Sequence, residues 1–317
     1  DALHAAGIDT FEADVRFAYR YLIDRQIKGG CRIVGEARAG SGVTWEFDDP
    51  DMFAARSQAK LGLLSFDIET DPKAERLLAI SLYGEAVDEV IVVDSRVRAM
   101  PDKAIRVADE YSALETFCAR VSALDPDVLT GWNVIDFDLS VLERIAKRVR
   151  HPLTLGRLPG AMRLRAAQGY FGSGQASLPG RLVLDGIDLL RGASVRMDDY
   201  SLDAVAKQVL GEGKALLGDN ADRAGEILHR YEHDLAGFCE YARTDSRLVL
   251  EILDKMDLIE LTLARSRLTG MTPDRVAASI ASFDFVYLSE LSRRKLVAPS
   301  VRSSDSRVHQ AQTGGYV

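Results

Sequence analysis

Cysteine and histidine are scarce in this chain and are not arranged as ligands. The 317 residues include three widely spaced cysteines, Cys31, Cys118 and Cys239, and no CxxC pair. This excludes a disulfide framework and a zinc ribbon, and we expect a reducing, cytoplasmic compartment. His229 and His233 are four residues apart, but no acidic residue at the zincin spacing accompanies them. We therefore predict no zinc site.

Long hydrophobic runs are also missing. No stretch of about 18 apolar residues occurs, so we expect no membrane-spanning segment. The chain opens on Asp1-Ala2-Leu3-His4, without an initiator methionine or a signal-peptide pattern. We interpret it as a fragment that lacks residues at one or both ends.

The charge balance narrows the possible functions. The net charge of −8 argues against a protein that simply coats nucleic acid. It leaves room for an enzyme that acts on DNA, because such an enzyme combines local positive charge with carboxylates that hold cations. The hydrophobic content of 47% is sufficient for a globular core.

The order of predicted elements divides the chain into three parts. Residues 1–58 predict a small mixed α/β unit, residues 59–269 a large α/β domain, and residues 270–317 a helix followed by a polar linker. In the large domain, short strands at 61–69, 77–83 and 89–93 predict an antiparallel meander. Strands at 128–132 and 182–185 then alternate with helices at 113–124 and 138–150. Together they predict a mixed β-sheet flanked by helices.

The first acidic pattern lies at the end of a buried strand. Asp67 and Glu69 are two residues apart, so both project from one strand face, while Phe66 and Ile68 point into the core. Two neighbouring carboxylates repel each other, and a divalent cation relieves that repulsion. A strand end that simply turns polar at the surface is the alternative.

Two further patterns contain acids. Asp138 follows Asn133 at a strand-to-helix edge, where ligands of α/β sheets gather, although Asp138 could equally be a helix N-cap. Tyr241 and Asp245 are four residues apart, which places them on one face of a helix. Three other acids, Asp185, Asp188 and Asp203, are predicted to be helix caps or surface residues.

The three patterns in this order resemble the exonuclease motifs of DEDD nucleases in their tyrosine variant. The wording "SFDIET", "GWNVIDFDLSVL" and "YARTDSRLVLEIL" is similar to that of family B DNA polymerases. "LDGIDLLR" and "YSLDAVAKQVLGEGK" resemble the segment between the second and third motifs of bacterial DNA polymerase II, and the closing "GGYV" resembles the entry to that family's palm.

This resemblance implies an RNase H-like 3′→5′ exonuclease that proofreads DNA and releases nucleoside monophosphates. It implies that Asp67, Glu69, Asp138 and Asp245 hold two Mg²⁺ or Mn²⁺ ions. These carboxylates are hard oxygen ligands, which suit such ions. It also implies that Tyr241 orients the attacking water, since the ordinary tyrosine pKa of about 10 disfavours a general base.

The resemblance has consequences for the whole protein. Residues 1–58 would be part of a polymerase N-terminal domain, and the polymerase's own catalytic motifs would lie beyond Val317. The expected partners are a single-stranded or frayed DNA 3′ end, the palm, fingers and thumb of the full-length chain, and a sliding clamp bound through the missing part. The expected location is the cytoplasm of a bacterium, in association with the nucleoid.

Substrate contacts are predicted from position. Thr70 and Asn133 lie next to metal ligands and could touch the terminal nucleotide, or they could form local backbone hydrogen bonds. Phe137 is a candidate for base stacking, but a core position is favoured. The basic stretch 144–165, followed by Tyr170 and Phe171, suits single-stranded DNA. A solvated helix face explains its first part equally well.

Two other functions remain open at this point. A stand-alone DEDD exonuclease acting on DNA or RNA would have the same motif spacing. A catalytically silent DNA-binding module would have the same fold, but it would not need all four carboxylates and the tyrosine.

Overall fold

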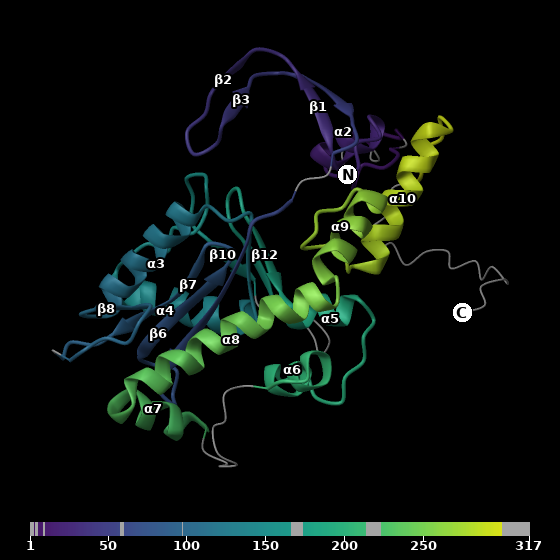
Figure 1. Ribbon diagram of the computed structural model, residues 1–317. Helices are drawn as coiled ribbons and strands as arrows, with labels where there is room; N and C mark the ends of the chain where they lie inside the picture. The colour runs from purple at the N-terminus through teal and green to yellow at the C-terminus, as the bar shows by residue number, and fades with distance from the viewer. Residues whose placement is uncertain are drawn as a thin grey trace.

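A six-stranded mixed sheet forms the centre of the protein (Figure 1). The structure is a computed structural model that describes residues 3, 6–8, 10–57, 60–96, 98–165, 174–213 and 223–299. The sheet has the strand order β12-β9-β5-β6-β7-β8. The strand bounds are β5 Leu63–Thr70, β6 Leu77–Gly84, β7 Val87–Val93, β8 Ala104–Val107, β9 Val128–Gly131 and β12 Leu182–Asp185. A mixed sheet flanked by helices is the predicted fold class.

Strands β5, β6 and β7 form the predicted antiparallel meander. Asp67 of β5 pairs with Ser81 of β6, and Ser81 pairs with Val90 of β7. Strands β9 and β12 lie parallel to β5 on its other side. The parallel edge strand β8 was not predicted, and it extends the sheet beyond β7.

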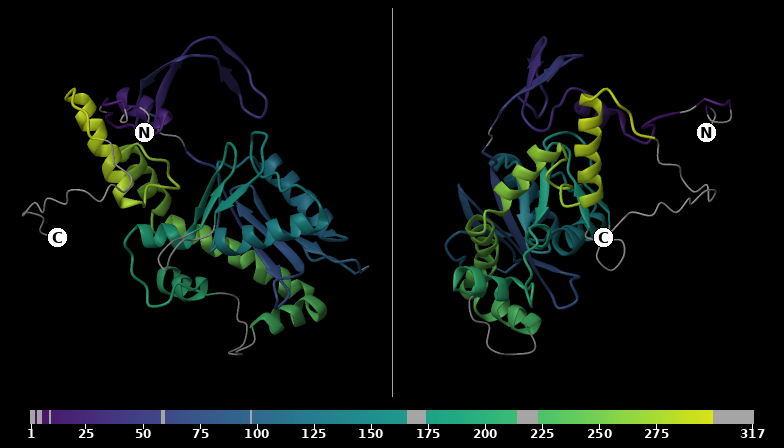
Figure 2. Two further views of the ribbon diagram at one scale, coloured as in Figure 1. Left: turned by 180° about the vertical axis from the view of Figure 1, so that it is seen from behind. Right: turned by 90° about the vertical axis from the view of Figure 1, so that its right-hand side faces the viewer.

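Helices cover both faces of this sheet. On one face, α3 (Glu110–Leu124) and α4 (Ser140–Val149) pack on a core that includes Phe66, Phe117 and Leu142. The long helix α8 (Leu235–Lys255) crosses the other face and contacts β5 and β6 (Figure 1). The view from behind shows α3 and α4 on the face opposite α8 (Figure 2). The site described below therefore lies between β5 and α8.

The remaining helices of this part surround α8. They are α5 (Gly186–Gly192), α6 (Leu202–Leu210), α7 (Arg223–His233) and α9 (Leu258–Thr269). Leu190, Val205 and Ile252 bring α5, α6 and α8 into one buried cluster. Across the described ranges, none of the helices combines the length and the apolar character needed to cross a bilayer.

The second motif adopts a conformation that the sequence did not predict. Before α4 begins at Ser140, the chain forms a π-helical turn, η1 (Ile135–Leu139). Asp138 lies within this turn and is not the N-cap of a helix, which corrects the capping alternative. Its side chain instead accepts a hydrogen bond from the backbone N–H of Ile68 on β5.

The N-terminal part is a separate, smaller arrangement of a helix and two hairpin-like pairs. It contains α2 (Phe17–Asp24), β1 (Cys31–Val34), β2 (Ala37–Ala39), β3 (Trp45–Phe47) and β4 (Asp51–Ala54). β1 pairs with β4 and β2 with β3, both antiparallel, which forms the long ribbon at the top of Figure 1.

Helix α10 (Ser279–Arg293) brings a late segment of the chain into contact with the N-terminal part. It packs against α2, where the rings of Tyr19 and Phe285 are 4.8 Å apart. The Gln26 amide donates a hydrogen bond to the Ser289 carbonyl at 3.0 Å. The predicted helix after residue 270 is thus a support for the N-terminal part. Most of the predicted polar linker and the "GGYV" ending fall outside the described residues.

Candidate active site

The alternation of strand β5 places two acids on the side of the sheet that faces α8. Phe66 and Ile68 are buried in the core beneath α3 and α4. Asp67 and Glu69 therefore project from the opposite face. Glu69 is buried, and Asp67 is half-buried.

A hydrogen bond between two serines holds α8 against the sheet. The hydroxyls of Ser246 and Ser81 are 2.5 Å apart, and both side chains are buried. Ser246 directly follows Asp245, and Ser81 is the cross-strand partner of Asp67. This contact between two small polar residues lets α8 approach closely and brings Asp245 over Asp67.

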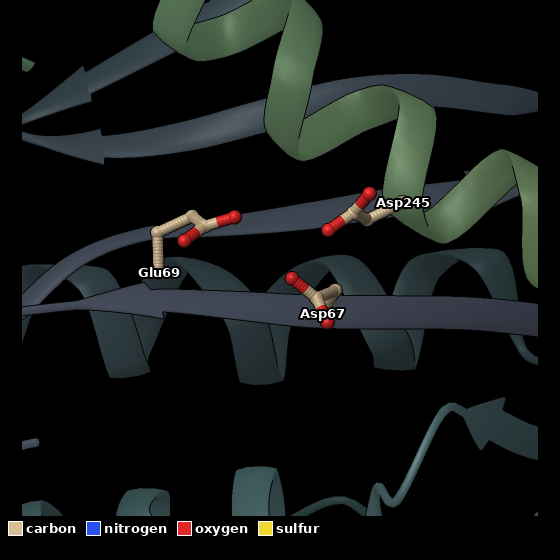
Figure 3. A group of neighbouring side chains, drawn as sticks. All are labelled: Asp67, Glu69 and Asp245. Carbon is tan, nitrogen blue, oxygen red and sulfur yellow. The ribbon is translucent and has the colours of Figure 1, made fainter. Parts of the chain in front are cut away.

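Three carboxylates converge at this contact. Oxygen atoms of Asp67, Glu69 and Asp245 all lie within 4.8 Å of one another. Figure 3 shows the three carboxylates pointing into one shared space, two from β5 and one from α8. Carboxylates so close together repel strongly, and a divalent cation bound between them would relieve that repulsion. Three hard oxygen ligands fit Mg²⁺ or Mn²⁺.

Asp138 lies beside this group but is not part of it. Its Oδ1 accepts a hydrogen bond of 3.0 Å from the backbone N–H of Ile68, between the two acids of β5. Its Oδ2 is buried and has no hydrogen-bond partner within the described part of the chain. Burial, and after it the charge of Asp67, raises the pKa of the Asp138 carboxyl well above its ordinary value. A buried, partly unsatisfied oxygen of this kind is suited to a cation.

A cavity of about 320 Å³ opens beside the carboxylates. Tyr241, buried on the same face of α8 as Asp245, lines it together with Thr70 and Phe137. The Thr70 hydroxyl donates to the Asp71 carbonyl at 3.0 Å, so Thr70 forms a local backbone bond and also lines the cavity. Phe137 is 39% exposed, so the core position favoured for it is wrong. The ring faces the cavity because the π-helical turn keeps it out of the core.

Asn133 is placed differently from the other candidates. It is exposed, has a left-handed φ of 60°, and its carbonyl accepts a bond from Phe137 N–H at 3.0 Å. It is not among the residues that line the cavity. Because that bond involves only the main chain, the role of the Asn133 side chain, as a substrate contact or in a local backbone bond, stays a prediction.

The basic stretch 144–165 is largely occupied by contacts within the protein. Arg148 binds the Glu75 carbonyl and the Glu110 carboxylate, and Arg157 binds Asp125 and Asp127. These contacts favour a structural role for both arginines over the DNA contact that was predicted. Tyr170 and Phe171 lie outside the described residues.

The sequence prediction missed one residue that lines the cavity and one hydrogen bond of a residue that it did name. Ile227 of α7 lines the cavity opposite β5, and no sequence signal pointed to it. Asp185 caps α5 as predicted, with Oδ1 accepting from Ile187 N–H at 2.9 Å. It is nevertheless 6% exposed, and its Oδ2 also accepts from Ile135 N–H at 3.3 Å. Its position at the end of a buried strand was the available signal.

Comparisons with known proteins agree with this arrangement. Residues 8–205 match the family described as DNA polymerase family B, exonuclease domain. That range includes Asp67, Glu69 and Asp138 and ends before α8. The chain is similar to DNA polymerase II of Escherichia coli (strain K12), with 33% identity over 320 residues, covering 99% of this chain and 40% of that protein.

More distant relatives show the same pattern of coverage. A DNA polymerase of Archaeoglobus fulgidus is 25% identical over 298 residues, which cover 92% of this chain and 35% of that protein. The solved family B DNA polymerase of Pyrobaculum calidifontis has a similar fold, with a TM-score of 0.70 and 23% identity over 96% of this chain and 39% of that one. This chain therefore spans well under half the length of these relatives. The family match and the 33% identity show that the chain belongs to the family B DNA polymerases and contains their exonuclease domain.

Proposed function

We propose that this part of the chain is a metal-dependent 3′→5′ exonuclease that proofreads DNA within a DNA polymerase II-like enzyme. The observation that carries the proposal is the convergence of Asp67, Glu69 and Asp245 within 4.8 Å, beside a cavity. A catalytically silent DNA-binding module would gain nothing from holding three repelling carboxylates together. The site is therefore organised for chemistry.

The acids would hold two Mg²⁺ or Mn²⁺ ions. Asp67, Glu69 and Asp245 would hold one ion, and Asp67 would also help to hold the other. Asp138, with its unsatisfied Oδ2, would help to hold this second ion directly or through water. When bound, such an ion pair lowers the pKa of a water molecule and stabilises the charge on the leaving 3′ oxygen.

Other residues bind and orient the reactants. The Tyr241 hydroxyl orients the attacking water, a role supported by the position of Tyr241 in the lining of the cavity together with the acids. The exposed ring of Phe137 offers a face on which a base can stack. Thr70, on the same side of the cavity, contacts the terminal nucleotide.

The proposal extends to partners through the longer relatives. The substrate is a single-stranded or frayed 3′ end of DNA. The palm, fingers and thumb of a full-length chain supply the primer, and a sliding clamp binds through that further part. Such an enzyme works in the bacterial cytoplasm, at the nucleoid. A stand-alone nuclease is the competing interpretation, and the size of the native gene product on a gel decides between them.

A degradation assay tests the activity. A DNA single strand with a labelled 3′-terminal nucleotide is incubated with the protein in Mg²⁺, in Mn²⁺ and in EDTA. We expect release of labelled mononucleotide with either metal and none in EDTA, and no extension of a primer. Asp245→Ala should remove the activity, while Asp254→Ala, an exposed acid on the same helix, should retain it. Absence of metal-dependent release would contradict the proposal, and primer extension would contradict the domain assignment.

A further inference from the structure

The carboxylate of Asp185 joins two segments that meet at one edge of the sheet. It lies at the end of β12, where it pairs with Gly131 at the end of β9. Its Oδ1 accepts from Ile187 N–H at 2.9 Å, and its Oδ2 accepts from Ile135 N–H at 3.3 Å. One buried side chain thus connects the first turn of α5 with the first residue of η1, 50 residues earlier in the chain.

The connection continues to the acids of the site. Ile135 begins the single π-helical turn that contains Asp138, and the turn is closed by a 2.8 Å bond from Leu139 N–H to the Val134 carbonyl. Asp138 in turn accepts from Ile68 N–H on β5 at 3.0 Å. Two carboxylates in series therefore link β12, η1 and β5.

The bonding pattern of Asp185 is more than a helix cap requires. Asp109 and Asp234 cap α3 and α8 by accepting from backbone N–H groups of their own helix, among them Ser112 at 2.8 Å and Gly237 at 3.0 Å. Asp185 accepts a second N–H from a different element, and it does so while 6% exposed. The two donors bond to different oxygens of Asp185, Oδ1 and Oδ2. A carboxylate has an acceptor at both positions, whereas an asparagine amide has an acceptor at one and a donor at the other.

We propose that Asp185 is a positioning residue that holds η1 in place, so that Asp138 presents its unsatisfied Oδ2 to the metal site. The inference rests on the proposed function for the role of Asp138 as a ligand. Without Asp185, the buried N–H of Ile135 has no acceptor, and η1 moves to satisfy it. Substitution of a residue that holds a metal ligand in place commonly weakens metal binding by about 10- to 100-fold.

Mn²⁺ binding tests this role independently of catalysis. Free Mn²⁺ is measured by electron paramagnetic resonance in titrations of the wild type, Asp185→Ala, Asp185→Asn and the matched cap variant Asp109→Ala. We expect Asp185→Ala to weaken Mn²⁺ binding by about 10-fold or more. Asp185→Asn, which keeps one acceptor, should lie in between. Asp109→Ala should lose thermal stability and bind Mn²⁺ like the wild type.

The kinetic counterpart separates positioning from substrate binding. In the nuclease assay, Asp185→Ala should need a higher Mg²⁺ concentration for half-maximal rate and should have a lower kcat, with an unchanged KM for DNA. Folded Asp185→Ala protein that binds Mn²⁺ like the wild type would overturn the inference. If Asp185→Ala does not fold, wild-type Mn²⁺ binding by Asp185→Asn would overturn it in the same way, and weakened binding would support it.

The result for the wild type separates this inference from the proposed function. Wild-type protein that binds Mn²⁺ but releases no nucleotide would contradict the proposed exonuclease, while the loss of Mn²⁺ binding in Asp185→Ala would still support the positioning role. A wild type that binds no Mn²⁺ would overturn both. An active wild type with an unaffected Asp185→Ala variant would overturn the positioning role alone.

Discussion

Asp67 has two neighbouring carboxylates, and we expect its replacement to change both the nuclease rate and the melting temperature. With oxygens of all three acids within 4.8 Å, Asp67→Ala removes both the proposed shared metal ligand and part of the repulsion. We expect the nuclease rate to fall by about a thousandfold or more, since metal ions supply several kcal/mol of transition-state stabilisation. In EDTA the melting temperature should rise. A lower melting temperature in EDTA than that of Glu115→Ala, an exposed acid on α3, would contradict this account.

Asp185 gives a prediction for the pH dependence of stability. Burial, and after it the charge of Asp188, raises the pKa of Asp185 from 3.8 to about 6. The hydrogen bonds from Ile135 and Ile187 lower this pKa but do not outweigh the burial. Because the folded state holds this proton more tightly than the unfolded state, stability is lost as pH rises from about 4 through 6. The shift of about two pKa units corresponds to roughly 3 kcal/mol.

The neutral variant isolates this contribution. Asp185→Asn has no charge to bury, so its free energy of unfolding relative to the wild type should rise between pH 4.5 and 7, by roughly 2–3 kcal/mol. Urea denaturation in EDTA across this range measures the difference. If the two proteins differ in free energy of unfolding by the same amount at every pH, ionisation of the Asp185 carboxyl does not destabilise the folded state.

At the scale of elements, the packing of α8 on β6 sets the position of Asp245 relative to Asp67. Ser246 and Ser81 are buried at this contact, with hydroxyls 2.5 Å apart. Ser246→Ala should cost about 1 kcal/mol of stability and little activity. Ser246→Leu overpacks the contact, at about 1–3 kcal/mol, and should move Asp245 away from Asp67. Its nuclease rate at a temperature where the protein is folded should therefore fall far below that of Ser246→Ala. Equal rates would show that α8 tolerates the shift.

At the scale of the whole molecule, the position of the acids beside a cavity predicts selectivity for unpaired ends. In the proposed exonuclease, a 3′ end leaves its complement to reach the carboxylates, and separating one stacked step costs about 1.4 kcal/mol on average. A mismatch has already lost much of that stabilisation, so mismatched ends should be degraded up to about tenfold faster than matched ends. Rates on 3′-labelled duplexes that differ only in the terminal pair measure this. Equal rates would mean that selectivity does not come from melting.

The local features of the site were predictable because they depend on short-range periodicity. Alternation along a strand placed Asp67 and Glu69 on one face, and helical spacing placed Tyr241 with Asp245. The antiparallel meander and the mixed sheet followed from runs of apolar residues with turns between them. The roles of the site residues and the domain boundaries at 58 and 269 remain predictions.

The sequence by itself determined which acids were available and which faces they occupied, since those follow from backbone geometry over a few residues. Only the tertiary structure decided how the faces meet. The Ser81–Ser246 contact joins α8 to β6 next to β5, the π-helical turn buries Asp138 and exposes Phe137, and Asp185 bonds across 50 residues to Ile135. These outcomes depend on packing between distant segments, and no local pattern in the sequence encodes the distance between them.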